Sequence, residues 1–172
     1  NSPGIATIYN NIGAVYKEMG HFDKSLEAHS SSLAIRKILG KEISIGKSLL
    51  NLGNLFERMK HWDEAATYFQ EALYLFEKNQ YTRGLADVHH NLANSYLLLK
   101  KIREAKHHYN ESLKYEFLLK DPVGIAASTF GLGLILQSEN RTTEAITLIQ
   151  SLIDSSILSN SPSLLSESHL KF

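Results

Sequence analysis

Residues 45–74 read IGKSLLNLGNLFERMKHWDEAATYFQEALY. Apolar residues recur in this stretch every three or four positions, which predicts helices rather than strands. A polar break at Lys60-His61-Trp62-Asp63 divides the stretch into two helices. Gly53 in the first helix and Ala65 in the second are small, so the two helices can pack closely as an antiparallel hairpin.

The same pattern repeats every 40 residues without a gap. Residues at equivalent positions of this 40-residue repeat form a column. The first small column holds Gly13, Gly53, Ala93 and Gly133. The second small column holds Ser25, Ala65, Ala105 and Ala145. The aromatic columns hold Tyr16, Phe56, Tyr96 and Leu136, and His29, Phe69, Tyr109 and Ile149. A fixed period of this length is typical of a solenoid, in which each hairpin buries its apolar faces against its neighbours.

The columns predict the bounds of each helix. First helices are expected at about 4–19, 44–59, 84–99 and 123–138, and second helices at about 24–39, 64–79, 104–119 and 143–158. Asp23 and Asp63 are expected to be N-caps. Asp121-Pro122 and Ser161-Pro162 pair an N-cap with a proline in the first turn, where its missing N–H costs nothing.

These columns resemble the tetratricopeptide repeat family, whose pattern alternates small and aromatic residues. The 40-residue spacing is similar to the subclass found in Pins/LGN-type polarity adaptors, kinesin light chains and bacterial regulators, and Leu-Gly-Asn at 52–54 resembles the adaptors. The resemblance implies an all-α, right-handed solenoid of four helix-turn-helix hairpins. It also implies that the first helices line a concave face that binds a partner.

The chain is expected to hold a repeat array over residues 1–160, with repeats at about 4–43, 44–83, 84–122 and 123–160. Residues 161–172 are expected to begin a fifth or capping helix, because Ser161-Pro162 repeats Asp121-Pro122 at the same period.

Composition excludes several functions. The 172 residues carry 18 basic and 18 acidic side chains, so the basic footprint of a nucleic-acid binder is missing. The chain has no cysteine, which excludes disulfides and thiolate metal sites and fits a reducing, cytoplasmic location. No apolar run is long enough for membrane insertion.

Signatures of an enzyme or a cofactor site fail. Gly131-Leu132-Gly133 begins a phosphate-loop pattern, but the third glycine and the preceding strand are missing. Glu104 and His107 have the spacing of two metal ligands on one helical face, but a second converging pair is missing. His107 and His108 are instead expected to face solvent. The sequence therefore predicts a non-catalytic chain without metal or cofactor.

The concave face is predicted to bind a peptide, and its candidate residues lie on the first helices. They are Asn11, Lys47, Leu50, Asn51, Asn54, Arg58, His90, Asn91, Asn94, Leu97, Leu98, Phe130 and Leu134. Two columns of asparagine stand out, because a carboxamide can pair with the C=O and N–H of an extended peptide. The alternative is that these asparagines tie neighbouring helices together.

Two further features of this face bear on the partner. The late part of the face is apolar at Leu97, Leu98, Phe130 and Leu134, which marks an interaction site or a surface covered by a neighbouring element. The columns beside the asparagines hold Leu50, Ala127 and Gly131 where a clamp for a terminal carboxylate needs lysine or arginine. An internal segment of a protein partner therefore fits better than a charged C-terminus.

The predicted function is a protein-interaction scaffold that holds a peptide segment in its concave groove. Two alternatives stay open. One is a sensory segment of a bacterial signalling or transcription regulator that receives a small peptide or effector. The other is self-association through the C-terminal end, with Leu164, Leu165 and Phe172 docking onto another copy.

Overall fold

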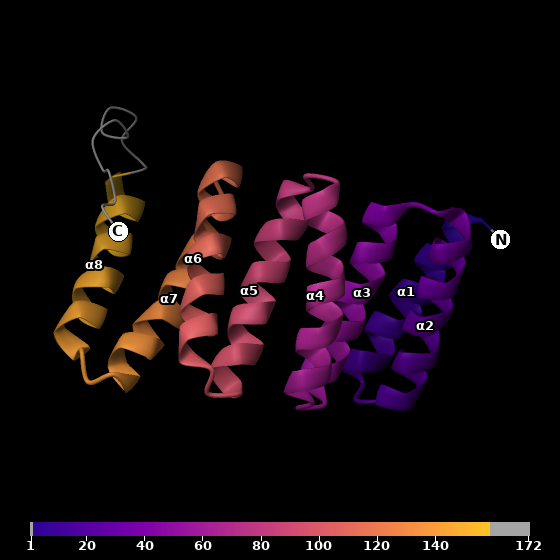
Figure 1. The fold of residues 1–172 in the computed structure, drawn as a ribbon, viewed down its shortest axis with the longest axis horizontal. Coiled ribbons are helices and arrows are strands. Elements are labelled where there is room, and N and C mark those ends of the chain that lie inside the picture. Colours follow the sequence, from indigo (N-terminus) through magenta and orange to yellow (C-terminus); the bar gives the residue numbers. More distant parts are fainter. Residues whose placement is uncertain (1, 159–172) are drawn as a thin grey trace.

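The computed structural model describes residues 2–158, and the predicted helix at 161–172 lies outside the described residues. The described part contains eight α-helices in one stacked array that runs from α1 and α2 at one end to α8 at the other (Figure 1). The first helices of the hairpins are α1 (Pro3–Glu18), α3 (Glu42–Arg58), α5 (Thr82–Leu98) and α7 (Pro122–Ser138). The second helices are α2 (Phe22–Leu39), α4 (Trp62–Lys78), α6 (Ile102–Leu119) and α8 (Thr142–Leu158). The predicted all-α solenoid is confirmed.

The turns between the helices repeat with the same period as the helices. Left-handed backbone occurs at Gly20, Lys60, Lys100 and Asn140 within hairpins, and at Gly40, Gln80 and Lys120 between them. The amide that follows each of these residues within a hairpin donates to a carbonyl five residues earlier, as from His21 to Tyr16 and from His61 to Phe56. This closure satisfies carbonyl groups that the end of a helix would otherwise leave unpaired. Most of these left-handed positions are occupied by residues other than glycine, although L-residues disfavour this conformation. The hydrogen bond that closes the turn helps to stabilise it there.

The predicted N-caps of the second helices are wrong. α2 and α4 begin at Phe22 and Trp62, so Asp23 and Asp63 lie inside the first turn, and neither helix has a side-chain cap. The carboxylates there still face the positive end of the helix dipole. Asp121 does cap α7 as predicted, accepting a hydrogen bond from the amide of Gly124 at 3.0 Å.

The small columns set how closely the two helices of a hairpin approach. A Cβ atom on Gly53 would lie 2.3 Å from Cε1 of Phe69, and one on Gly13 would lie 2.8 Å from the ring of His29. Ala65 and Phe69 are fully buried. The core continues from hairpin to hairpin, because each second helix also packs against the next first helix.

His108 does not face solvent as predicted, whereas His107 is exposed. The ring of His108 stacks on Tyr96 with centroids 5.4 Å apart, and its Nδ1 lies 2.9 Å from Nδ1 of His89. One helical step of about 100° separates His108 from the inward-pointing Tyr109, and this step places His108 at the edge of the α5–α6 interface. Burial lowers the pKa of both His89 and His108 to about 4.

Candidate functional site

The predicted binding residues all lie on α1, α3, α5 and α7, the first helices, which contact one another in sequence along the array. The surface that these helices share is called the first-helix face below. Six of the predicted residues are exposed: Asn11, Lys47, Arg58, Leu98, Phe130 and Leu134. Seven are half-buried: Leu50, Asn51, Asn54, His90, Asn91, Asn94 and Leu97.

Two amide pairs bridge neighbouring first helices. Asn51 Nδ2 donates to Asn10 Oδ1 at 2.5 Å, between α3 and α1. Asn91 Nδ2 donates to Asn54 Oδ1 at 2.9 Å, between α5 and α3. Each pair uses one N–H and one carbonyl oxygen, so the remaining amide groups keep both donor and acceptor capacity. Both pairs are ties between neighbouring helices, the alternative that the sequence left open for these asparagines, and the partner of Asn51 is Asn10, which is not among the candidate binding residues.

Counting around the first helix places Asn10 on its inner stripe, but its column reads Asn10, Leu50, His90 and Phe130 and did not mark it as a binding residue. A position that changes character in every repeat does not suggest a shared role. Only the offset between α1 and α3 places the Asn10 amide beside Asn51.

Asn94 is held by a residue from the second helix of its own hairpin. The Tyr109 hydroxyl donates to Asn94 Oδ1 at 2.6 Å. Burial raises the pKa of Tyr109 to about 12, so the hydroxyl keeps its proton at neutral pH. With its oxygen occupied in this way, Asn94 presents its NH₂ group as a donor.

His90 belongs to a buried polar chain that links α5, α6 and α7. Its Nδ1 lies 3.0 Å from Ser128 Oγ, and Ser128 Oγ donates to Glu116 Oε1 at 2.9 Å. Because the serine proton is directed at Glu116, His90 Nδ1 must be the donor to Ser128, which leaves Nε2 as an acceptor. Burial lowers the pKa of His90, which favours this neutral form.

This chain of His90, Ser128 and Glu116 contains the residue types of a hydrolase triad in the wrong order. A nucleophilic serine must donate to the histidine, and the histidine must donate to the carboxylate. Here the serine lies in the middle, donates directly to the carboxylate and is fully buried. The arrangement therefore fits a structural link between three helices.

The late part of the first-helix face carries exposed apolar side chains. Leu98, Phe130 and Leu134 are 51%, 57% and 40% exposed. Leu50 and Leu97 are half-buried and pack against the core, so they offer less surface to a ligand. Among the predicted binding residues, the exposed apolar side chains are thus on α7 and at the end of α5.

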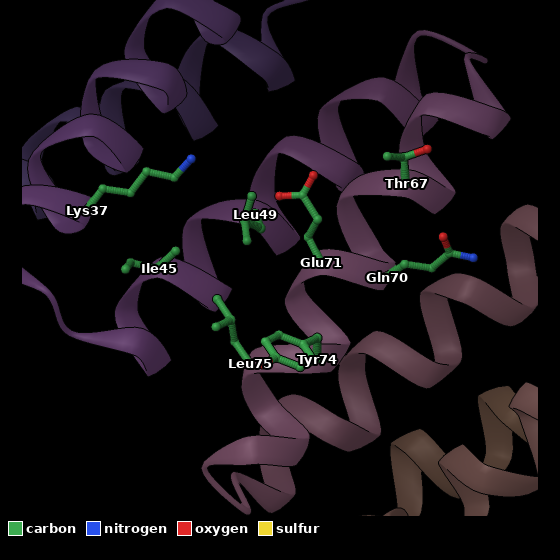
Figure 2. Close-up of a pocket in the computed structure, with 8 residues that line it drawn as sticks. All are labelled: Lys37, Ile45, Leu49, Thr67, Gln70, Glu71, Tyr74 and Leu75. Carbon is green, nitrogen blue, oxygen red and sulfur yellow. The ribbon is translucent and has the colours of Figure 1, made fainter.

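A groove of about 470 Å³ lies away from this face, where α2 and α4 flank part of α3 (Figure 2). Its apolar floor comes from Ile45, Leu49 and Leu75, and Tyr74 stands at its side. The sequence pattern does not predict this groove, because its lining comes from three helices and its polar residues follow an ordinary surface pattern. The remaining lining residues are Lys37, Thr67, Gln70 and Glu71.

Neither a metal-binding cluster nor a membrane-spanning helix is found among the described residues. No group of three or more histidine or acidic side chains there is placed to hold a metal ion. Between residues 2 and 158, no helix combines the length and the apolar character needed to cross a bilayer.

Comparison with known sequences agrees with the repeat geometry. Models described as the tetratricopeptide repeat match residues 5–42 and 44–115. The chain belongs to the tetratricopeptide repeat family. No protein with a curated description matches this tetratricopeptide chain significantly.

Solved structures share the fold at low sequence identity. BtubC (BKLC) from P. vanneervenii superposes with a TM-score of 0.81 at 20% identity, covering 94% of this chain and 67% of that one. A putative kinesin light chain of Podospora anserina, with nearly identical TPR-like repeats, gives 0.77 at 18% identity, covering 94% and 78%. The Rap conjugation gene regulator of plasmid pLS20, in complex with the Phr* peptide, gives 0.77 at 20% identity, covering 94% and 44%. These likenesses establish a shared solenoid fold.

Proposed function

We propose that this tetratricopeptide chain is an interaction scaffold that binds an extended peptide segment of a partner along its first-helix face. The observation that carries the proposal is the pair of amide bridges, Asn10 with Asn51 and Asn54 with Asn91. Each bridge fixes the orientation of two carboxamides before a ligand arrives, which lowers the entropy cost of binding. The resulting donors and acceptors suit a peptide backbone, whatever its side chains.

The specificity of such a site would come from its two ends. Lys47 and Arg58 supply exposed positive charge near the asparagines of α3. Leu98, Phe130 and Leu134 supply an apolar surface at the other end. The preferred ligand is therefore an extended segment with apolar side chains at one end and acidic or polar ones at the other.

Selection from a phage-displayed library of short unstructured peptides tests the proposal. We expect selected peptides to lose at least about tenfold in affinity when Asn91 is replaced by alanine, and again with Phe130→Asp. Tyr74→Asp is the matched control, because Tyr74 is 65% exposed and lies in the groove between α2 and α4. Selected peptides that respond to Tyr74→Asp and not to the first-helix variants would place binding in that groove and refute the proposal.

A second candidate is a regulatory segment that receives a short free peptide. The fold of the Rap regulator, whose structure contains the Phr* peptide, favours this alternative. Small-angle scattering of the chain with and without a saturating selected peptide separates the two functions. A regulatory segment should change its overall dimensions on binding, whereas a scaffold should keep them.

A further inference from the structure

A buried cluster of polar groups joins the first-helix face to the interior between α5, α6 and α7. Glu116 Oε1 lies 2.8 Å from Ser112 Oγ and 2.9 Å from Ser128 Oγ. Ser112 Oγ also lies 2.9 Å from the carbonyl oxygen of Ala86, and Ser128 Oγ lies 3.0 Å from His90 Nδ1. The two serines and Glu116 are at most 3% exposed, so bulk water cannot complete these four contacts.

The number of protons decides how the four contacts are made. When Glu116 is ionised, the two serine hydroxyls and one ring N–H of His90 can turn three of the four contacts into hydrogen bonds. If Ser128 donated to His90 instead, the ring proton would lie outside the cluster and only two contacts would be hydrogen bonds. A hydrogen bond to a carboxylate is also stronger than one to a neutral imidazole. Ser128 therefore donates to Glu116, and His90 carries its proton on Nδ1.

Protonation of Glu116 does not change this outcome. Burial raises the pKa of Glu116, so its neutral form must be considered as well. The added proton can lie on Oε1 and point to Ser112, which then donates to the carbonyl of Ala86, and all four contacts become hydrogen bonds. This complete set again requires that Ser128 donates to Glu116 and that His90 Nδ1 donates to Ser128. Glu116 thus has the same effect on His90 in both protonation states.

The other ring nitrogen of His90 is free to meet a ligand. Nε2 has no hydrogen-bond partner among the described residues and is open to solvent. Burial lowers the pKa of His90, so the ring is neutral at neutral pH. With the proton on Nδ1, Nε2 can only accept a hydrogen bond. One turn further along α5, Asn94 presents its NH₂ group as a donor, because the Tyr109 hydroxyl occupies its oxygen.

We propose that Glu116 is a positioning residue of the peptide site, which acts through Ser128 to make His90 Nε2 an obligatory hydrogen-bond acceptor. This inference rests on the proposed function. N–H and C=O groups alternate along each edge of an extended peptide, so a peptide N–H would meet His90 while a neighbouring C=O meets Asn94. The peptide residue at His90 cannot then be proline, which has no N–H.

Glu116→Gln should reverse the polarity of His90. Glu116 Oε2 is buried and has no hydrogen-bond partner among the described residues, so the amide oxygen of glutamine fits there better than its NH₂ group. The NH₂ group then takes the place of Oε1 and donates to both serines. Ser112 donates to Ala86, and Ser128 donates to His90 Nδ1, which moves the ring proton to Nε2. All four contacts are hydrogen bonds in this arrangement as well.

NMR of the free chain tests the position of this proton. Long-range proton–nitrogen correlation spectra of isotope-labelled histidine distinguish a protonated ring nitrogen from a bare one, and His90→Phe identifies the signals of His90. We expect the proton on Nδ1 in the parent chain and on Nε2 in Glu116→Gln. Glu104→Gln is the matched control, because it makes the same change at an exposed position of α6, and it should leave the proton on Nδ1.

Ser128→Ala is a second variant that breaks the same link. Without the serine oxygen, Nδ1–H would be a buried donor with no acceptor, so the proton should again move to Nε2. Circular dichroism should report the same helicity for the parent chain and the variants, and Ser128→Ala decides if Glu116→Gln fails to fold. The proposal is overturned by a parent chain with its proton on Nε2, or by a folded variant of either kind that keeps it on Nδ1.

Recognition of a peptide N–H is tested with a peptide selected on the parent chain. Single N-methyl groups are placed along this peptide in turn. At one position the methyl group should lower the affinity at least about tenfold for the parent chain and for Glu104→Gln, because it removes the N–H that His90 accepts. The same methyl group should have little effect on the affinity for Glu116→Gln, which already binds the unmethylated peptide weakly.

The failure of this inference and the failure of the proposed function give different results. A ring proton in the wrong place, read without any ligand, overturns the inference and leaves the peptide site untouched. A correct ring proton with no N-methyl position that responds to Glu116→Gln would refute the recognition of an N–H at His90. Failure of the proposed function is seen separately, in selected peptides whose affinity ignores Asn91→Ala and Phe130→Asp.

Discussion

Replacing Gly53 with alanine tests the packing that sets the spacing of a hairpin. A Cβ atom at this position would lie 2.3 Å from Cε1 and 2.5 Å from Cδ1 of Phe69, far inside contact distance. Phe69 is fully buried and has no room to withdraw. Either the ring must leave its rotamer or α3 and α4 must move apart.

Two opposing effects set the size of the change. Alanine gains about 1 kcal/mol of helix propensity over glycine. Overpacking of a buried site costs about 1–3 kcal/mol, and the depth of this overlap places Gly53 at the upper end of that range. We therefore expect the free energy of unfolding to fall by about 1–2 kcal/mol and the melting temperature by roughly 2–8 °C.

Urea unfolding, followed by circular dichroism and by fluorescence of the single tryptophan, Trp62, measures this change. Gly4→Ala is the control, because a Cβ atom there would meet only Ser2 Oγ, at 3.5 Å. Gly4→Ala should leave the free energy of unfolding unchanged or raise it slightly. If Gly53→Ala were as stable as the parent chain, the small column would reflect something other than the close approach of two helices.

Three further predictions concern buried or capping polar groups. Because burial lowers the pKa of His89 and His108 to about 4, the folded chain binds fewer protons than the unfolded chain between that value and about 6.5. Stability should therefore be lost as the pH falls through this window, and His108→Phe should reduce the loss measured by urea unfolding at several pH values. Burial raises the pKa of Glu116, because the charged carboxylate is disfavoured inside the protein. Glu116→Gln should therefore raise the free energy of unfolding at neutral pH. This gain should shrink as the pH falls, because the carboxyl of the parent chain then takes up a proton. Asp121→Ala should lower the free energy of unfolding by about 1 kcal/mol, because it removes the cap of α7. Arg83→Ala removes only the exposed ion pair with Asp121 and should lower it by less. The midpoints of urea unfolding compare the two variants.

The sequence predicted every described helix to within about two residues, because a solenoid is nearly one-dimensional. Each hairpin touches only its neighbours, so the same local pattern has the same meaning in every repeat. The errors occurred where a single residue decides the outcome. Asp23 and Asp63 are good capping residues, but each second helix begins two residues too early for them to cap it.

The helix that carries each candidate residue was predictable, and the hydrogen-bond partners of these residues were not. The candidate residues were placed on the first helices by counting around each helix, and the described helices carry them there. The hydrogen-bond partners could not be counted in this way, because they depend on the offset between helices. Asn10 and the pairing of His89 with His108 both arise at such boundaries.

Tyr109 explains why the amide column ends where it does. In the first two hairpins the ring of this column, His29 or Phe69, lies on the small-column glycine of its own hairpin, Gly13 or Gly53. In the third hairpin that glycine is replaced by Ala93.

The ring of Tyr109 instead lies against the next hairpin, where a Cβ atom on Gly131 would be 2.2 Å from its Cζ. Gly131 occupies the column of Asn11, Asn51 and Asn91. The tyrosine therefore takes the place that a fourth asparagine would fill, and its hydroxyl holds Asn94 from the same position. The loss of the asparagine at position 131 thus accompanies the shift of the glycine that meets this ring from α5 to α7. Restoring a side chain at Gly131 should consequently disturb the α6–α7 contact before it could extend the amide column.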